Sequence, residues 1–429
     1  MNGYMKGFAL LCCLVFCGAI AEAASLADKS NEFAFKMRRE IGASGGGARN
    51  TVFSPFSAYQ MLGLLYMCSD GEGADEIARL AGFPGREALP GGFNRLISES
   101  VGGEEKVKTA NSVWLSSLAS PNPAFVKMLE DDFHGEFFSS NFLNRDTAAS
   151  RIDDWASKST LGLIRSISTD FPPNTAFAVL NASAFIKEWE YKFMERDTSP
   201  DVFHAEDGDV KTPFMRGANR GAAYKYDPRR DLSMLKIRYA GGEYSMLILM
   251  RGRMDGGHFG ASGPGVPSAN ARSAAEAFPS SPDGLVKDAA EYLEISDILK
   301  EPSGYCGIYL SMPKFSIGGF AVNLNDCFRK MGIKKIFAGK NTDFAPLSPN
   351  LNAVFWEVVM GEMKSVSMIE VDEEGTKAAS VSVSVSVGCS AAADILLDVK
   401  VDRPFAYFVV HNKSGLILFM GKIGDPSRN

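Results

Sequence analysis

The sequence predicts an α+β fold in a single large domain, with helices mainly in the first half of the chain and strands mainly in the second. Three observations lead to this prediction. Apolar residues recur at helical spacing in early segments, short apolar runs typical of strands dominate later ones, and strands and helices do not alternate regularly. The chain has 429 residues, 45% of them hydrophobic, which is ample for a large buried core.

The N-terminus is typical of a secretory signal peptide at residues 1–23, which leaves 24–429 as the mature protein. Lys6 supplies a positive charge, Gly7–Ile20 is apolar but short for a membrane span, and Ala21 to Ala23 is a small-x-small cleavage site. The alternative is a buried first helix. We expect a secreted, extracellular protein.

Helical periodicity then predicts three helices, at Leu26–Ile41, Ser57–Ser69 and Arg151–Ile167. Ser54 followed by Pro55 is a favourable start for the second helix, because serine caps the first turn and proline fits its first position. We expect this helix to stop at Gly71 and Gly73.

Later apolar runs predict five strand segments, at Ser245–Met250, Ile308–Phe315, Val354–Val371, Leu396–Lys400 and Phe405–Met420. The last segment holds a hairpin around Asn412 to Gly415. Residues 251–284 are rich in Gly, Ser, Pro and Ala and cannot bury much surface, so they predict a surface insertion in the single domain rather than a linker between two domains.

No pattern of catalytic residues is visible, so an enzyme is not expected. The chain has four histidines without HExxH spacing, no Gly-x-Ser-x-Gly motif and no phosphate-binding glycine loop. Cys68, Cys306 and Cys327 lie far apart and are expected to be buried free thiols, not zinc ligands. We therefore expect no metal and no cofactor. A net charge of -6 gives no reason to expect nucleic acid or an anionic membrane as partner.

The segment 370–393, EVDEEGTKAASVSVSVSVGCSAAA, has the most distinctive pattern in the chain. After Gly375 come small residues, and Val then alternates with Ser up to Val387, which is strong strand periodicity without charge. One interpretation is an ordinary interior strand. The other is an exposed strand that enters a sheet later, with Gly375 as a freely turning hinge.

This segment resembles the hinge and reactive-centre loop of inhibitory serpins, in which an acidic pair and Gly-Thr precede small residues. Five further motifs occur in the family's order: FSPFSAYQMLGLLYMCSDGEGADEI at 53–77, NASAFIKEWEYKF at 181–193, YLSMPKF at 309–315, CFRKMGIKKIFAGKNTDFAPLS at 327–348 and VDRPFAYFVVHNKSGLILFMGKIGDP at 401–426. The resemblance covers nearly the whole mature chain. It implies three sheets, eight or nine helices and a loop exposed above one end.

The resemblance also implies a suicide substrate, whose cut loop inserts into the large sheet and traps the protease as an acyl-enzyme. The family's spacing from Gly375 places the scissile bond at Cys389-Ser390, with Gly388 or Val387 as earlier alternatives. Without Arg or Lys between Ala378 and Val399, an elastase-like or chymotrypsin-like serine protease is expected, or alternatively a cathepsin-like cysteine protease. A non-inhibitory carrier, chaperone or storage protein with the same fold stays open.

Other positions carry over from the family motifs one by one. The hinge consists of Glu373, Glu374, Gly375, Thr376, Ala378, Ala379 and Ser380. Ser54, Ser57, Asn181 and Ser365 match the polar cluster beneath the strands that must separate, and Trp189 matches the aromatic residue where the loop enters. Ser365 replaces the family's histidine, and Lys377 and Val381 depart from the usual hinge.

Asn412 begins a glycosylation sequon on the expected hairpin tip, whereas Asn181 is expected to be interior. The mixed charges at 86–108 give no reason to expect heparin activation. We expect a monomer that forms a covalent complex with its target protease.

Overall fold

The structure is a computed structural model that describes residues 26–42, 49–102, 107–167, 171–255, 285–286, 289–298, 307–338, 344–355, 359–361, 363–376 and 397–428. The expected signal peptide, most of the 251–284 segment, and residues 377–396 of the Val/Ser segment lie outside these ranges. Within them, no helix combines the length and hydropathy needed to cross a bilayer.

Three sheets form the framework. The largest runs β3-β2-β4-β14-β15-β5, with β12 also paired to β14 and β13 to β4. Its strands are β2 Val107–Ser116, β3 Glu136–Ser140, β4 Thr175–Phe185, β5 Lys187–Glu188, β12 Phe315–Asn323, β13 Val359–Met360, β14 Lys364–Val371 and β15 Gly375–Thr376. The six-stranded sheet contains β1 Thr51–Phe53, β18 Ile417–Ile423, β17 Phe405–His411, β10 Tyr244–Arg251, β9 Leu232–Arg238 and β8 Ala223–Asp227. The four-stranded sheet contains β16 Leu397–Lys400, β11 Ile308–Pro313, β7 Gly208–Asn219 and β6 Ser199–Ala205.

Nine α-helices occur within the described residues, in agreement with the eight or nine expected. The first covers residues 26–42. The others are α2 Pro55–Cys68, α3 Gly71–Ala81, α4 Leu89–Ser100, α5 Pro123–Asp132, α6 Arg145–Ser159, α7 Ala289–Ile298, α8 Leu324–Lys330 and α9 Leu351–Val354. Two short 3-10 helices lie at Glu195–Asp197 and Lys335–Phe337.

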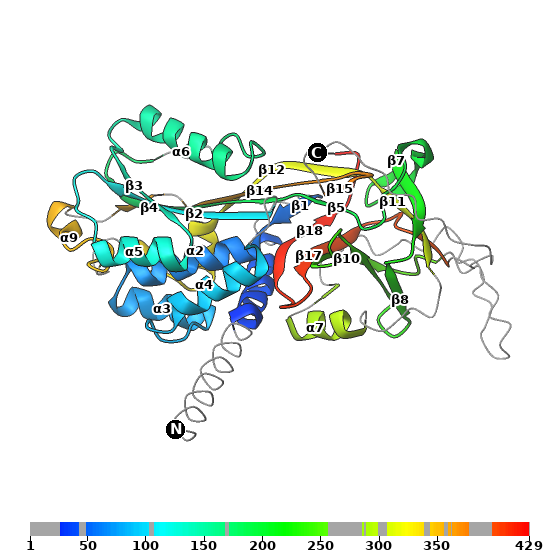
Figure 1. The fold of residues 1–429 in the computed structure, drawn as a ribbon, viewed down its shortest axis with the longest axis horizontal. Coiled ribbons are helices and arrows are strands. Elements are labelled where there is room, and N and C mark those ends of the chain that lie inside the picture. Colours follow the sequence, from blue (N-terminus) through cyan, green and yellow to red (C-terminus); the bar gives the residue numbers. More distant parts are fainter. Residues whose placement is uncertain are drawn as a thin grey trace, which may run out of the picture.

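Helices cover the large sheet unequally. Helix α6 crosses one face, while α2 to α5 pack beneath the opposite face (Figure 1). A small apolar cluster under α6 contains Ile152, Trp155 and Ala182. The main core lies on the other side, between the large sheet, α2 and the six-stranded sheet. Of the 14 residues of α2, 13 are buried, so this helix is the central support of the sheet.

Two helix predictions need correction. Helix α2 ends at Cys68, but Gly71 begins α3 instead of ending α2, because Asp70 accepts the Gly71 N–H at 2.8 Å and caps a new helix. The helix predicted at Arg151–Ile167 runs from Arg145 to Ser159. Asn144 caps its start by accepting the Thr147 N–H, which the apolar periodicity alone did not indicate.

The strand predictions are correct at β10, β16 and the β17–β18 hairpin. Two other segments that the sequence predicted as strands each contain more than one element. Residues 308–315 divide at Lys314 into β11 and β12, which belong to different sheets. Residues 354–371 contain the end of α9 and two strands, β13 and β14. Strands β2 to β7 also occupy the first half of the chain, so helices and strands are more mixed than predicted.

One edge of β14 has two neighbours. Its lower part pairs with β4 in parallel at only Ser365↔Asn181 and Val366↔Ala182, and its upper end pairs with β15 at Val371↔Thr376. In the described residues, no strand pairing joins 367–370 of β14 to 183–186 across this edge. We call this line between β4 and β14 the seam. Strand β15 closes it near the end of the large sheet that faces β7 and β11 (Figure 1).

Candidate functional site

The top of the seam is closed by the predicted hinge. Asp372 to Gly375 form a tight turn in which the Asp372 carboxylate accepts the N–H groups of Glu374 and Gly375 at 3.0 and 3.2 Å. After this turn β15 runs antiparallel to both β14 and β5, with Gly375 opposite Glu188 and Thr376 opposite Lys187. Gly375 and Thr376 of the hinge therefore lie between β14 and β5 of the large sheet.

Glu373 fastens this turn to its surroundings. Its carboxylate accepts a hydrogen bond from Lys314 Nζ at 2.6 Å and another from Thr198 Oγ1 at 2.7 Å, and the residue is 5% exposed. Burial by itself would raise the pKa of this carboxyl, but the Lys314 and Thr198 bonds outweigh burial and lower the pKa below its usual value. Glu374 forms a second ion pair, with Lys192 Nζ at 2.7 Å.

Aromatic residues cover the end of the hinge. Trp189 is buried, donates its indole N–H to the Asp372 carbonyl at 3.0 Å and stacks on Tyr239 with ring centroids 4.6 Å apart. The Tyr239 hydroxyl is 2.8 Å from Thr376 Oγ1. Trp189 thus lies against the turn that precedes β15, while Tyr239 was not predicted.

Close approach to a neighbouring strand requires Gly375 in this state. Its φ is not positive, and its predicted role as a freely turning hinge stays a prediction. A Cβ at this position would lie 2.1 Å from the Lys187 carbonyl oxygen and 2.7 Å from Glu188 Cα. The absence of a side chain is what lets the hinge approach the backbone of β5.

The middle of the seam is held by a buried network of neutral polar groups. Ser54 Oγ donates to the Leu418 carbonyl at 2.7 Å, and Ser57 Oγ donates to Ser54 Oγ at 2.8 Å and contacts Ser183 Oγ. Ser183 in turn donates to Asn181 Oδ1 at 2.8 Å. The network therefore links α2, β4 and β18, as the sequence predicted for Ser54, Ser57 and Asn181.

Two further strand residues and one helix residue complete this network. Asn181 Nδ2 donates to Asn111 Oδ1 at 2.8 Å and to Thr109 Oγ1 at 3.1 Å, both on β2. Asn111 Nδ2 donates to Gln60 Oε1 at 2.9 Å. Ser365 is the register partner of Asn181 across the seam, but the Ser365 hydroxyl forms no hydrogen bond with Asn181 among the described residues.

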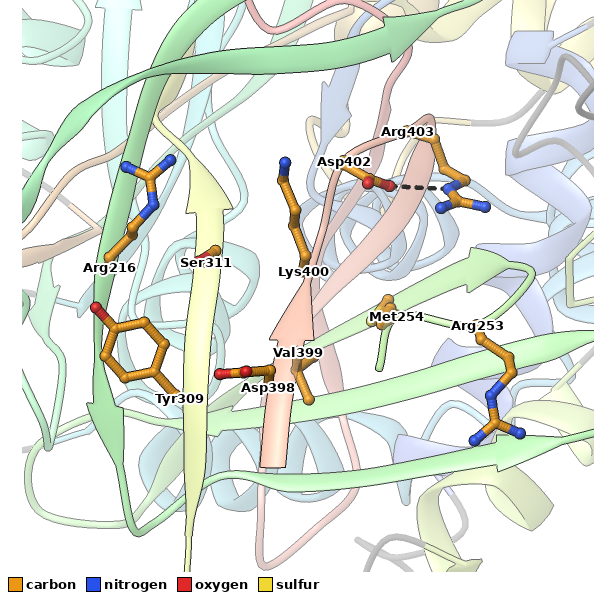
Figure 2. Close-up of a pocket in the computed structure, with 10 residues that line it drawn as sticks. All are labelled: Arg216, Arg253, Met254, Tyr309, Ser311, Asp398, Val399, Lys400, Asp402 and Arg403. Atoms are coloured by element: carbon orange, nitrogen blue, oxygen red, sulfur yellow. Dashed lines mark hydrogen bonds and ion pairs between the residues drawn. The ribbon is translucent and has the colours of Figure 1, made fainter. Parts of the chain in front are cut away.

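A separate cavity of about 410 Å³ lies beside β16 (Figure 2). It is lined by Arg216, Arg253, Met254, Tyr309, Ser311, Asp398, Val399, Lys400, Asp402 and Arg403. Each cation that lines the cavity pairs with a carboxylate. Asp201 pairs with both Arg216 and Lys400. Asp402 pairs with Arg403, and Asp255 pairs with Arg253. Burial opposes ionisation of Asp201, but its hydrogen bonds lower the pKa of this carboxyl to about 2. The cavity therefore offers no excess of positive charge.

The arrangement is suited to a change of strand pairing at the seam. No group of three or more His, Cys, Asp or Glu side chains suited to a metal occurs within the part of the chain that the structure describes. What the site offers is a sheet with a short central pairing and a neighbouring segment that has begun to enter it.

Comparison with known proteins decides the family. The profile of the family described as "Serpin (serine protease inhibitor)" matches residues 28–257 and 278–426. The chain belongs to the serpin family. Serpins are in general protease inhibitors and not enzymes.

Individual serpins resemble the chain along most of its length. An uncharacterized serpin-like protein of Thermococcus kodakarensis is 26% identical over 92% of this chain and 84% of that protein. Mouse leukocyte elastase inhibitor A is 23% identical over 88% of this chain and 93% of that protein. The structure of human glycosylated kallistatin matches with a TM-score of 0.75 at 21% identity, covering 94% of this chain and 99% of that chain, and supports the fold.

Some predicted residues of this serpin cannot be placed. Ala378, Ala379, Ser380, Cys389 and Ser390 lie outside the described residues, so the predicted scissile bond and the inner hinge stay predictions.

Asn412 lies at the β17–β18 tip, but its Nδ2 donates to the Gly242 carbonyl at 2.8 Å. A glycan at Asn412 would replace one of the two Nδ2 hydrogens and leave one N–H to donate. Cys68 and Cys327 are buried free thiols, as predicted.

Several site residues were missed, although some left a signal in the sequence. Ser183, like the predicted Asn181, interrupts a largely apolar strand in which all 11 residues are buried, and the missed Gln60 interrupts the apolar helix α2. Polar residues in such segments indicate a buried network, because burial of an unpaired amide is unfavourable. Lys314 and Thr198 gave no comparable signal, since their partner Glu373 is far away in the chain.

Proposed function

We propose that this serpin is a secreted inhibitor that traps an elastase-like or chymotrypsin-like serine protease after cleavage at Cys389-Ser390. The observation that carries the proposal is the position of Gly375 and Thr376 between β14 and β5. This pairing is the first step of a strand that, continued downward, would fill the seam. A cut in the loop would release the rest of the strand to follow.

The register of β15 shows how well such a strand would fit. Counting from Thr376, which is opposite Val371 and Lys187, Ser380 would come opposite Ser367 and Ser183. Ser382 would likewise come opposite Ser365 and Asn181. Ser365 and Asn181 are already register partners, so the strand would enter between them without changing the register of β4 or β14. The buried Ser367 hydroxyl, which has no hydrogen-bond partner among the described residues, would gain a neighbour that can bond to it.

The valines of the alternating segment fit the opposite face of the sheet. In the same register Val381 falls opposite Val366 and Ala182, which are buried in the apolar cluster under α6. Because side chains alternate between faces, serines would meet the polar network and valines would meet α6. This match makes Val381, an atypical hinge residue, acceptable in the inserted strand.

The absence of Arg and Lys between Ala378 and Val399 favours a protease with an apolar or small specificity pocket. Likeness to leukocyte elastase inhibitor A supports the same choice. A cathepsin-like cysteine protease is the alternative target class. Secretion rests on the signal-like residues 1–23 and is tested by intact mass of the protein recovered outside the expressing cells.

The test is to incubate the mature protein with elastase, chymotrypsin and a cathepsin, and to separate the products on a denaturing gel. A band at the summed mass of inhibitor and protease, with mass spectrometry locating the cut at Cys389-Ser390, is the expected result. Cleavage without any such band across the panel would contradict inhibition. In that case a melting temperature unchanged by cleavage would identify a non-inhibitory serpin.

A further inference from the structure

Gln60 stands out in the buried network for its composition and its position. It is the only glutamine in the chain, lies in α2 and is 0% exposed. A carboxamide in such a position has to form hydrogen bonds on both its oxygen and its nitrogen, since an unpaired buried polar group opposes folding. The two halves of the Gln60 amide meet this requirement very differently.

The oxygen of Gln60 is crowded with donors. Gln60 Oε1 accepts from Asn111 Nδ2 at 2.9 Å, from Thr109 Oγ1 at 3.0 Å and from Asn181 Nδ2 at 3.4 Å. Thr109 and Asn111 belong to β2, and Asn181 belongs to β4. One atom of α2 therefore holds two neighbouring strands of the large sheet.

The nitrogen of Gln60 has no hydrogen-bond partner among the described residues. Exchange of the oxygen and nitrogen positions would aim the Gln60 NH₂ at the Asn111 NH₂, whose orientation is fixed because it also donates to the Phe133 carbonyl at 3.0 Å. The closed sheet thus satisfies the acceptor of this amide and leaves its donor unsatisfied. A rearrangement that brings an acceptor to Nε2 would form a new hydrogen bond there and is therefore favoured.

Strands β2 and β4 must move together when the seam opens. They pair antiparallel over nine positions, from Val107↔Phe185 to Leu115↔Phe177, whereas β4 pairs with β14 at only two. The seam is therefore the weaker line, and β3, β2 and β4 leave β14 as one unit. The Gln60 bonds connect that unit to α2, on which it has to slide.

We propose that Gln60 is a positioning residue that controls opening of the large sheet, holding β2 and β4 shut through its oxygen and favouring release through its unpartnered nitrogen. The inference rests on the proposed function, because opening is the step that loop insertion needs. The role proposed for Gln60 concerns opening of the large sheet before and during insertion, and not cleavage of the scissile bond.

Its test compares Gln60→Met with Ser69→Ala in both the intact and the loop-cleaved protein. Methionine keeps the size of the side chain but removes the acceptor. Ser69 is a matched control. It is fully buried at the end of the same helix, and its hydroxyl donates to the Leu65 carbonyl of that helix at 2.7 Å. Loop cleavage by the panel proteases is verified by mass spectrometry.

We expect Gln60→Met to lower the melting temperature of the intact form by about 4 °C and that of the cleaved form by less than half as much. Ser69→Ala lowers both forms equally. If Gln60→Met also lowers both equally while the wild type still gains stability on cleavage, Gln60 has only a structural role and the proposed function survives. If the wild type gains nothing on cleavage, both proposals are wrong.

A measurement on the wild type avoids dependence on a variant that folds poorly. Cell-free synthesis with side-chain ¹⁵N-labelled glutamine gives a single side-chain NH₂ pair in the spectrum, because Gln60 is the only glutamine. After loop cleavage, these protons are expected to move downfield and to exchange more slowly with solvent as Nε2 gains an acceptor. Identical signals in the intact and cleaved protein would overturn the role of the nitrogen.

Discussion

The two ends of the seam are closed by different kinds of interaction. At its top, the hinge is held by backbone pairing of β15 and by charged contacts, with Glu373 bonded to Lys314 and Glu374 to Lys192. In the middle, α2, β2 and β4 are held by serine, threonine, asparagine and glutamine side chains that do not titrate. Only two residue pairs join β4 directly to β14.

This difference assigns separate tasks to the two regions. In the proposed insertion, the charged top would fix where a strand begins to enter, because Gly375 and Thr376 would set the register. The neutral middle fixes how easily the sheet opens below, because hydrogen bonds between neutral groups can exchange partners without exposing a charge in the interior. Changes at the top should therefore affect entry of the loop and respond to pH, whereas changes in the middle should not respond to pH.

The largest effect is expected from Gly375→Ala. The added Cβ would lie 2.1 Å from the Lys187 carbonyl oxygen, so the hinge would leave its place between β14 and β5. Crowding of this kind opposes insertion by about 1–3 kcal/mol, which is about a 5-fold to 150-fold loss of covalent complex relative to cleaved inhibitor. Densitometry of the gel measures the ratio. Gly85→Ala is the control, since nothing lies within 4 Å of its Cβ, and an unchanged ratio in Gly375→Ala would show that the hinge does not enter here.

A smaller effect is expected from Lys314→Met, which leaves the Glu373 carboxylate buried without its cation. Glu373 has a side chain 6% exposed, but Lys314 is 38% exposed, so solvent weakens the pair. We expect a loss of about 1–2 kcal/mol in the free energy of unfolding of the intact protein, measured in urea. The matched Lys413→Met, at a lysine side chain that is 78% exposed, should change it by less than about 0.5 kcal/mol. Equal losses would mean that Lys314 does not stabilise the hinge.

The pH dependence should separate the two regions more clearly. Because the folded pKa of Glu373 is lowered, its ionised form stabilises the protein above the unfolded pKa of about 4.3, and this stabilisation disappears as pH falls through the folded pKa. The stability difference between wild type and Glu373→Gln should therefore be constant from pH 6 to 8 and shrink below about pH 4. The difference between wild type and Asn111→Ala should stay constant over the same range. A Glu373 difference that persisted at low pH would contradict the assigned ion pair.

The family motifs and local patterns predicted the α+β fold, and the structure places Ser54, Ser57 and Trp189 beside the seam. They failed where the outcome depends on contacts distant in sequence. Lys314 is 59 residues from Glu373, and Gln60 is 51 residues from Asn111, so no spacing rule connects them. The close approach of Gly375 to Lys187 was not predicted, because it depends on a strand neighbour that periodicity does not identify.

The smallest effect concerns Lys377, the hinge residue that departs most in charge from the family pattern. One step beyond Thr376 in the β15 register, Lys377 would come opposite Glu370 of β14, so a lysine meets a carboxylate where the usual glutamate would meet a like charge. Opposite charges on paired strands stabilise by about 0.2–1 kcal/mol. Lys377→Glu should therefore raise the molar ratio of inhibitor needed per protease by about twofold to fivefold, and Glu370→Lys in the same chain should restore it. Rescue by the second substitution separates charge pairing from general damage to the hinge, because a misfolded hinge would not recover. Failure of the rescue would mean that the strand enters in another register, which would also remove the predicted contacts of Ser380 and Ser382.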